Sequence, residues 1–145
     1  MNATIERFGG ASTLIADYAH WVVLLRPQAV TLGSLIIAAK GEATAFAALP
    51  DAAFGELAQV IRDVESTLAG AISQARMNYL MLMMVDPHVH FHALPRYEGS
   101  RSRDGTAFAD HGWPGPPQLA GAIPLGDEQI AEQRAWLKGL WPLDR

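Results

Sequence analysis

A run of six residues near position 90 alternates strictly between histidine and apolar side chains, and a further apolar residue follows it. The histidines are His88, His90 and His92, and every residue between them is apolar. Because side chains along a β-strand project alternately to opposite faces, the pattern predicts a strand over residues 88–94. We expect the three imidazoles on one face of this strand and its apolar side chains in a core on the other face.

Four further segments have the patterns of regular structure. Short apolar runs at residues 21–25 and 35–39 predict two buried strands that pair antiparallel. Apolar side chains at steps of three and four predict a helix over residues 51–73, and a second helix is expected over residues 126–139. A mixture of strands and helices in this order is typical of the α+β class, with helices on one side of a mostly antiparallel sheet.

The segments on either side of the histidines are less regular. Residues 78–86 are apolar without a helical stripe, which predicts a central strand buried on both faces. Residues 96–118 are rich in Gly, Ser, Arg and Pro and predict a long, mainly irregular loop. The chain has 145 residues, a length that suits one domain over residues 1–145.

Composition excludes several classes of function. The absence of cysteine excludes disulfides, thiolate metal sites and a cysteine nucleophile. The net charge of −4 argues against a grip on polymeric nucleic acid, but it leaves room for a small phosphate-bearing ligand. The sequence has no recognisable targeting signal and no apolar run near the ~20 residues of a membrane helix, so a cytoplasmic protein without membrane contact is expected.

Three interpretations of the histidine face remain open from the residues themselves. A neutral imidazole can attack phosphorus, while a second imidazole assists the leaving group. Alternate histidines such as His88 and His92 could instead hold zinc, although only Asp86 stands near as a further ligand. The third interpretation is an exposed sheet face with no chemical role.

The motif itself then points to a family. Residues 88–94 match the His-φ-His-φ-His-φ-φ signature of the histidine triad family, where φ is an apolar residue. Residues 95–97 resemble its continuation in many bacterial members, and residues 31–40 are similar to the family's second-strand segment. Residues 113–117 look like the Trp-Pro element of some members, so the resemblance runs from about residue 12 to 118.

The resemblance implies a five-stranded antiparallel sheet with two helices, and a homodimer in which two sheets join. It implies a hydrolase or nucleotidyl transferase that breaks phosphorus–oxygen or phosphorus–nitrogen bonds in dinucleoside polyphosphates or nucleoside phosphoramidates. His90 would be the nucleophile that is transiently nucleotidylated, oriented by the carbonyl of His88. His92 would contact the phosphate or the leaving-group oxygen, and no metal ion or cofactor is implied.

The chain departs from the family at several places that would bind the nucleotide. Arg26 stands where better-studied members have an Asn or Asp that binds the ribose hydroxyls. An arginine only donates hydrogen bonds, so Arg26 would hold an extra phosphate or simply point to solvent. Ser34 and Glu42 replace histidines found in many members, and Val85 replaces a phosphate-binding Ser or Thr.

Other residues are candidates for nucleotide contacts. Asn78 matches a family Asn approximately. In some members the matching Trp-Pro segment reaches the partner's active site, so His111 or Trp113 is expected to touch a base. Together with Arg26 and Ser34, Asn78 and Trp113 form the predicted nucleotide-binding set. Three arginines are candidates for polyphosphate charge, with a solvated mobile loop as the alternative for the last two: Arg96, Arg101 and Arg103. Because the substrate contacts look depleted, a nucleotide-binding module with little turnover is the alternative function.

Overall fold

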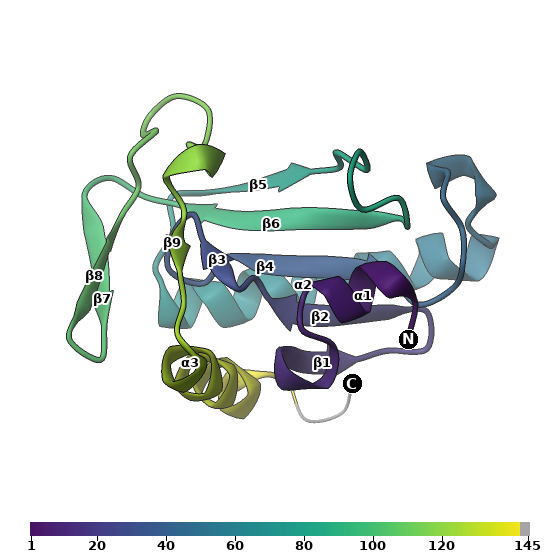
Figure 1. Ribbon diagram of the computed structural model, residues 1–145, viewed down its shortest axis with the longest axis horizontal. Coiled ribbons are helices and arrows are strands. Elements are labelled where there is room, and N and C mark those ends of the chain that lie inside the picture. The colour runs from purple at the N-terminus through teal and green to yellow at the C-terminus, as the bar shows by residue number, and fades with distance from the viewer. Residues whose placement is uncertain (143–145) are drawn as a thin grey trace.

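Five strands form one antiparallel sheet in the order β1-β2-β4-β6-β5, in a computed structural model that describes residues 1–142 (Figure 1). Every neighbouring pair in this sheet is antiparallel. The strands are Leu14–Asp17 (β1), Trp21–Leu25 (β2), Leu35–Ala39 (β4), Arg76–Leu80 (β5) and His90–Arg96 (β6). The α+β class and the five-stranded antiparallel sheet are therefore confirmed, as are the predicted strands at 21–25 and 35–39.

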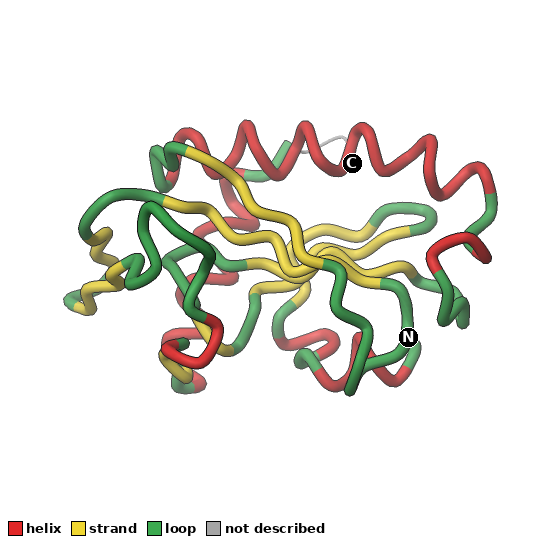
Figure 2. The backbone as a smooth tube through the Cα atoms, turned by 90° about the horizontal axis from the view of Figure 1, so that it is seen from above, coloured by secondary structure: helices red, strands yellow, loops and turns green. Residues whose placement is uncertain are grey.

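Helices cover both faces of this sheet. The helices are Ala3–Arg7 (α1), Asp51–Ala71 (α2) and Asp127–Leu140 (α3). Figure 2 shows the long helix α2 along one face and short helical segments near the N-terminus on the other. The prediction that helices lie on one side only is wrong because α1, too short to have a periodic pattern, packs against the opposite face.

Side chains of the central strands alternate between two cores. Val23 of β2 and Ile37 of β4 are buried in the larger core, with Val64 of α2. Val22 and Ile36 belong to a smaller core on the other face, which Ile5 of α1 completes. Strands buried on both faces need apolar residues at every position, which explains the unbroken apolar runs in the sequence.

The two predicted helices are confirmed within a few residues. Helix α2 follows Pro50, whose fixed φ suits the start of a helix, and its buried stripe includes Val60, Val64 and Leu68. Helix α3 buries Leu137 and packs on β1 and on α2.

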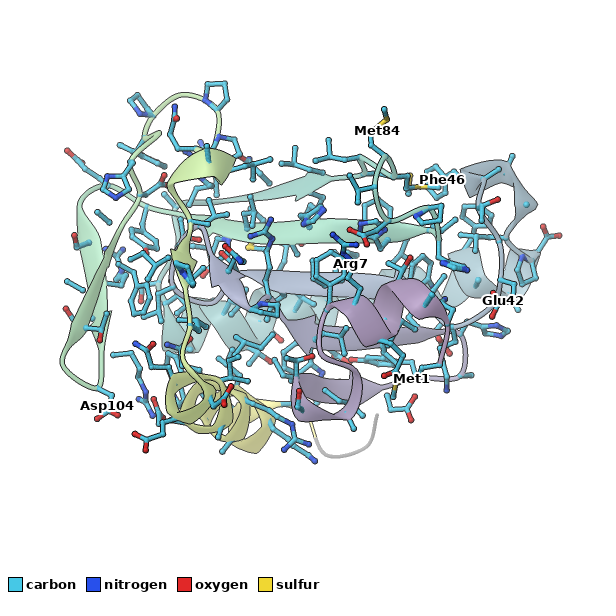
Figure 3. The ribbon with its side chains drawn as sticks, viewed as in Figure 1. Met1, Arg7, Glu42, Phe46, Met84 and Asp104 are labelled. Atoms are coloured by element: carbon cyan, nitrogen blue, oxygen red, sulfur yellow. The ribbon has the colours of Figure 1, made fainter. Side chains whose placement is uncertain are left out.

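The segment predicted as a central strand at residues 78–86 differs from that prediction. Strand β5 ends at Leu80 and is the edge of the sheet, and its pairing with β6 stops at His92. Met83 has a φ of 49° and turns the chain out of the strand direction. Met84 is 85% exposed and projects away from the body of the molecule (Figure 3), so apolar character here does not mark a buried strand.

Residues 96–118 are more ordered than predicted. Ser100–Arg103 (β7) and Thr106–Ala109 (β8) form an antiparallel hairpin. Its turn is Asp104-Gly105, with φ values of 50° and 82°, the Asp-Gly pair favoured in two-residue hairpin turns. A further small sheet joins Gln28–Ala29 (β3) to Ile123–Pro124 (β9). Single-turn 3-10 helices span Gly10–Ser12, Phe46–Ala48 and Leu119–Gly121.

Candidate functional site

His90 and His92 lie at the start of β6, on the sheet face that α1 covers. Their neighbours on β4 are Ala38 and Ile36, which belong to the smaller core. The strand begins at His90, so His88 precedes it, and the observed strand starts two residues later than the predicted one. The rings of His90 and His92 are 5.1 Å apart between centroids, and these residues are only 1% and 6% exposed.

The protonation of the His90 ring follows from one contact. Its Nδ1 lies 2.7 Å from the backbone oxygen of His88. A carbonyl oxygen can only accept, so Nδ1 carries the hydrogen and donates it. In the neutral ring the lone pair is then on Nε2, the nitrogen on the far side from the backbone.

His88 is held between two residues that are distant in the sequence. Its Nε2 lies 3.0 Å from Oε2 of Glu42, and a carboxylate accepts, so Nε2 donates. Its Nδ1 lies 2.8 Å from Oγ1 of Thr4, which also accepts the backbone N–H of His88 at 3.3 Å. In the neutral ring the Thr4 hydroxyl therefore donates to Nδ1. These three contacts hold the carbonyl that orients His90.

His92 has a cationic neighbour. Nε of Arg26, which directly follows β2, donates to Nδ1 of His92 at 3.1 Å. Burial, the Arg26 charge and His90 together lower the pKa of His92 to about 4. Burial also lowers the pKa of Arg26, which nevertheless stays a cation. His92 is thus a neutral ring at physiological pH.

The residue that follows α1, Phe8, covers the histidines with its aromatic ring. The centroid of Phe8 lies 5.6 Å from that of His90 and 5.8 Å from that of His92. Arg7, which Figure 3 labels on the same helix, pairs with Asp86 of the loop after β5 at 3.1 Å. Helix α1 and this loop thus meet over the two rings.

Two small cavities lie near the covered histidines and share Asp86 in their linings. One, of about 250 Å³, is lined by His90, His92 and the residues Leu82, Met83, Met84, Val85 and Asp86. The other, also about 250 Å³, is lined by Arg7, Phe8, Arg26, Pro27, Gln28 and Asp86. The first cavity reaches the imidazoles between mostly apolar side chains. The second is lined by Arg7 and Arg26, whose side chains carry guanidinium groups.

Helix α1 is the part of the site that sequence reasoning missed. Asn2 caps it by accepting the backbone N–H of Ile5 at 3.0 Å, and its side-chain amide donates to the carbonyls of Ala39 and Gly41. An Asn just before a helix is a typical cap, so Asn2 is the one signal that could have indicated the helix. A five-residue helix has too few turns for an apolar stripe.

Of the predicted nucleotide-binding residues, the structure brings only Arg26 to the histidines. Ser34 is buried and closes the turn before β4, where its hydroxyl accepts from the N–H of Thr31 and donates to the carbonyl of Thr31. The Ser34 hydroxyl makes its hydrogen bonds to Thr31 in this turn, and the nucleotide contact predicted for Ser34 stays a prediction.

Asn78 and Trp113 lie together at the opposite end of β6. They line a pocket of about 440 Å³ with Ala75, Arg76, Arg96, Pro114 and Gly115. Arg96 is six residues from His90 along the strand, about 20 Å at ~3.3 Å per residue. Within one chain, therefore, Asn78 and Trp113 are not part of the histidine site.

The three arginines considered for polyphosphate charge already have partners. Arg96 is buried and makes two hydrogen bonds to Asp110, at 2.7 and 3.0 Å. Arg101 stacks over Tyr97 and donates to the carbonyl of Ile72. Arg103 pairs with Glu132 and stacks over Trp136. Arg101 and Arg103 thus contact the body of the protein from the β7–β8 hairpin, and the role of the three arginines in binding polyphosphate stays a prediction.

Most of the histidine ring nitrogens that could bind a metal ion make hydrogen bonds within the protein. Both ring nitrogens of His88 and Nδ1 of His92 already have hydrogen-bond partners. Across residues 1–142 no group of three or more His, Asp or Glu side chains is arranged to hold a metal ion.

No helix within residues 1–142 is long and apolar enough to cross a membrane.

Comparison of the sequence with protein-family models and with curated proteins gave no match. Solved structures do match. A histidine triad protein from Bradyrhizobium japonicum has a TM-score of 0.72 at 16% identity, and the match covers 98% of this chain and 97% of that one. A diadenosine triphosphate hydrolase from Plasmodium falciparum has a TM-score of 0.65 at 9% identity, covering 89% and 76%.

A third structure is much longer than this protein. The NitFhit protein of C. elegans has a TM-score of 0.67 at 22% identity over 90% of this chain, which spans only 27% of that protein's length. At these identities the likeness is one of fold. This chain has an α+β architecture with a five-stranded antiparallel sheet, as expected for a match of that kind. The chain therefore has the histidine triad fold.

Proposed function

We propose that the protein is a nucleotide hydrolase or nucleotidyl transferase in which His90 is the nucleophile. The observation that carries the proposal is the 2.7 Å contact between Nδ1 of His90 and the carbonyl of His88. It leaves the lone pair on Nε2 of a ring held on a paired strand, which is the arrangement a nucleophilic imidazole needs. The fold, shared with a diadenosine triphosphate hydrolase, supports this choice of chemistry.

The reaction has two steps. Nε2 of His90 attacks the phosphorus of the nucleotide, so a P–N bond forms while the bond to the leaving group breaks and the leaving group takes the electron pair. The His90 ring becomes cationic, and the carbonyl of His88 stabilises its Nδ1–H. Water or another acceptor then attacks phosphorus, the P–N bond breaks, its electron pair returns to Nε2, and the acceptor's proton passes to solvent. No cofactor takes part in this scheme.

Substitution of the nucleophile tests the proposal. We expect His90→Ala to abolish turnover of dinucleoside polyphosphates and nucleoside phosphoramidates, with a matched loss of the nucleotidylated protein in mass spectra. Because His90 is buried, circular dichroism of the variant must match the wild type. Undiminished turnover by folded His90→Ala protein would refute the mechanism.

A nucleotide-binding module with little turnover is the second candidate. The observation in its favour is the cover over the site, since Phe8 lies against both rings and His90 is 1% exposed. Titration calorimetry with adenine and guanine nucleotides, beside a turnover assay, separates the two candidates. Binding without turnover would favour the module.

We also propose that the protein is a cytoplasmic homodimer whose two sheets join at β5. Strand β5 is the edge of the sheet, and exposed edges are ready to pair with a further strand. Such pairing would put the pocket of Asn78 and Trp113 near the partner subunit. Analytical ultracentrifugation tests the assembly, and a monomer at all concentrations would contradict it.

A further inference from the structure

The hydrogen bond from Arg26 to His92 determines where the His92 ring carries its proton. A guanidinium has donors and no acceptor, so Nδ1 of His92, 3.1 Å from Nε of Arg26, must hold a lone pair. The ring is therefore neutral, and its single hydrogen is on Nε2. Arg26 is itself held in place, because its Nη1 donates to the carbonyl of Gln28 at 2.6 Å.

The surroundings of His92 oppose a second proton on the ring. The residue is 6% exposed, and its nearest titratable or charged neighbours are Arg26 and His90. Asp86, the carboxylate in the adjoining cavity, is paired with Arg7 of α1. These surroundings are why the pKa of His92 falls to about 4.

A neutral imidazole with its hydrogen on Nε2 can donate a hydrogen bond but cannot act as a general acid. Release of that hydrogen would leave an imidazolate anion, whereas general-acid catalysis near neutral pH needs an imidazolium. His92 can thus stabilise a negative oxygen without protonating it.

We propose that Arg26 holds His92 as a neutral hydrogen-bond donor and thereby restricts the protein to substrates whose leaving group departs as a phosphate anion. The inference rests on the proposed function. As the bond between His90 Nε2 and phosphorus forms, the bridging P–O bond breaks and its electron pair stays on the departing phosphate oxygen. No proton is needed, and Nε2–H of His92 hydrogen-bonds the oxygen.

The alternative substrate class does not fit this arrangement. The nitrogen of a phosphoramidate leaves as an amine only after it gains a proton, which His92 cannot supply. A dinucleoside polyphosphate places a phosphate chain at the same position. Nη2 of Arg26 makes no hydrogen bond within residues 1–142, and Arg26 lines a cavity with Arg7, whose own guanidinium is paired with Asp86. The Arg26 guanidinium, which already contacts His92, can stabilise that phosphate chain.

The test uses substrates that share the same nucleotidyl group and differ only in the leaving group. Wild-type protein is assayed at pH 7.5 with a dinucleoside polyphosphate, a nucleoside phosphoramidate, and nucleotidyl aryl esters whose phenols span a range of pKa. We expect kcat/KM to be about 100-fold higher for the polyphosphate than for the phosphoramidate, since general-acid assistance is worth at least that factor. We also expect kcat/KM to rise steeply as the phenol pKa falls.

Arg26→Met removes the donor and the charge, while Arg26→Lys keeps a cation at a similar reach. We expect Arg26→Met to narrow the preference for the polyphosphate over the phosphoramidate at pH 6, because removal of the Arg26 charge raises the pKa of His92 while burial still opposes its protonation. A larger fraction of the His92 rings then carries a second proton and acts as an acid. Arg26→Lys should retain more of the preference. An unchanged preference in folded Arg26→Met protein would overturn the role of Arg26.

Two outcomes separate this inference from the proposed function. Turnover that depends on His90 but favours the phosphoramidate overturns the inference and leaves the function intact. No turnover of any substrate, or turnover that persists in His90→Ala, overturns both. Nitrogen-15 NMR of the wild type gives a check that needs no variant: Nδ1 of His92 must be unprotonated at pH 7, and an imidazolium there refutes the inference.

Discussion

Replacement of His92 by Asn should remove a large part of the acid sensitivity of folding. Asn places an acceptor oxygen close to the position of Nδ1, so the hydrogen bond from Arg26 can persist while the titration is lost. The pKa of His92 is about 4 in the folded protein, against ~6.5 in an unfolded chain. Below pH 6.5 the unfolded state therefore binds more protons than the folded state, and the free energy of unfolding decreases as the pH is lowered.

The size of the effect follows from the two pKa values. The His92 contribution to the free energy of unfolding is complete above pH 7 and is lost as pH falls toward 4. The linkage relation gives a loss of about 2 kcal/mol by pH 5 and about 3 kcal/mol by pH 4. These are losses relative to pH 8, where the His92 ring is neutral in both states.

Urea denaturation at pH 8, 6, 5 and 4 measures this loss. The difference in unfolding free energy between wild type and His92→Asn cancels the titration of all other groups to first order. We expect that difference to move by about 2 kcal/mol in favour of the variant between pH 8 and pH 5. A difference that stays constant across this range would show that His92 is not a buried neutral ring, and the reasoning on its proton would fail with it.

Three further predictions concern the cover of the site, a buried ion pair and a turn. Phe8→Ala should raise the rate of His90 modification by diethyl pyrocarbonate several-fold, whereas the control Phe46→Ala, an exposed phenyl with no His90 contact, should not. Asp110→Asn leaves the Arg96 charge buried without its partner and should lower the free energy of unfolding by about 3–5 kcal/mol in urea melts. Gly33→Ala should cost about 1–2 kcal/mol in the same assay, since φ is +83° there and the new Cβ would lie 3.1 Å from Ile72; a neutral Gly33→Ala would contradict the turn geometry.

Local periodicity was enough to predict the framework of the sheet and its helices. Strands β2 and β4 have the predicted ends, and α2 and α3 agree within a few residues, because burial on one or both faces leaves a regular pattern in the chain. The Asp-Gly pair at residues 104–105 is a sequence signal for the hairpin turn that the structure contains. The loop after β5 was mispredicted because an apolar composition does not say whether a neighbouring strand exists to pair with.

The chemical groups of the site can be read from the amino-acid sequence: three alternating histidines, no thiol, and a chain resembling the histidine triad family. The protonation and the hydrogen-bond partners of these histidines depend on the folded structure. His88 meets Thr4 and Glu42, and His92 meets Arg26, across separations of 84, 46 and 66 residues. The tautomer of a buried imidazole depends on which donor or acceptor faces it, and strand pairing and helix packing bring those groups together from distant parts of the chain.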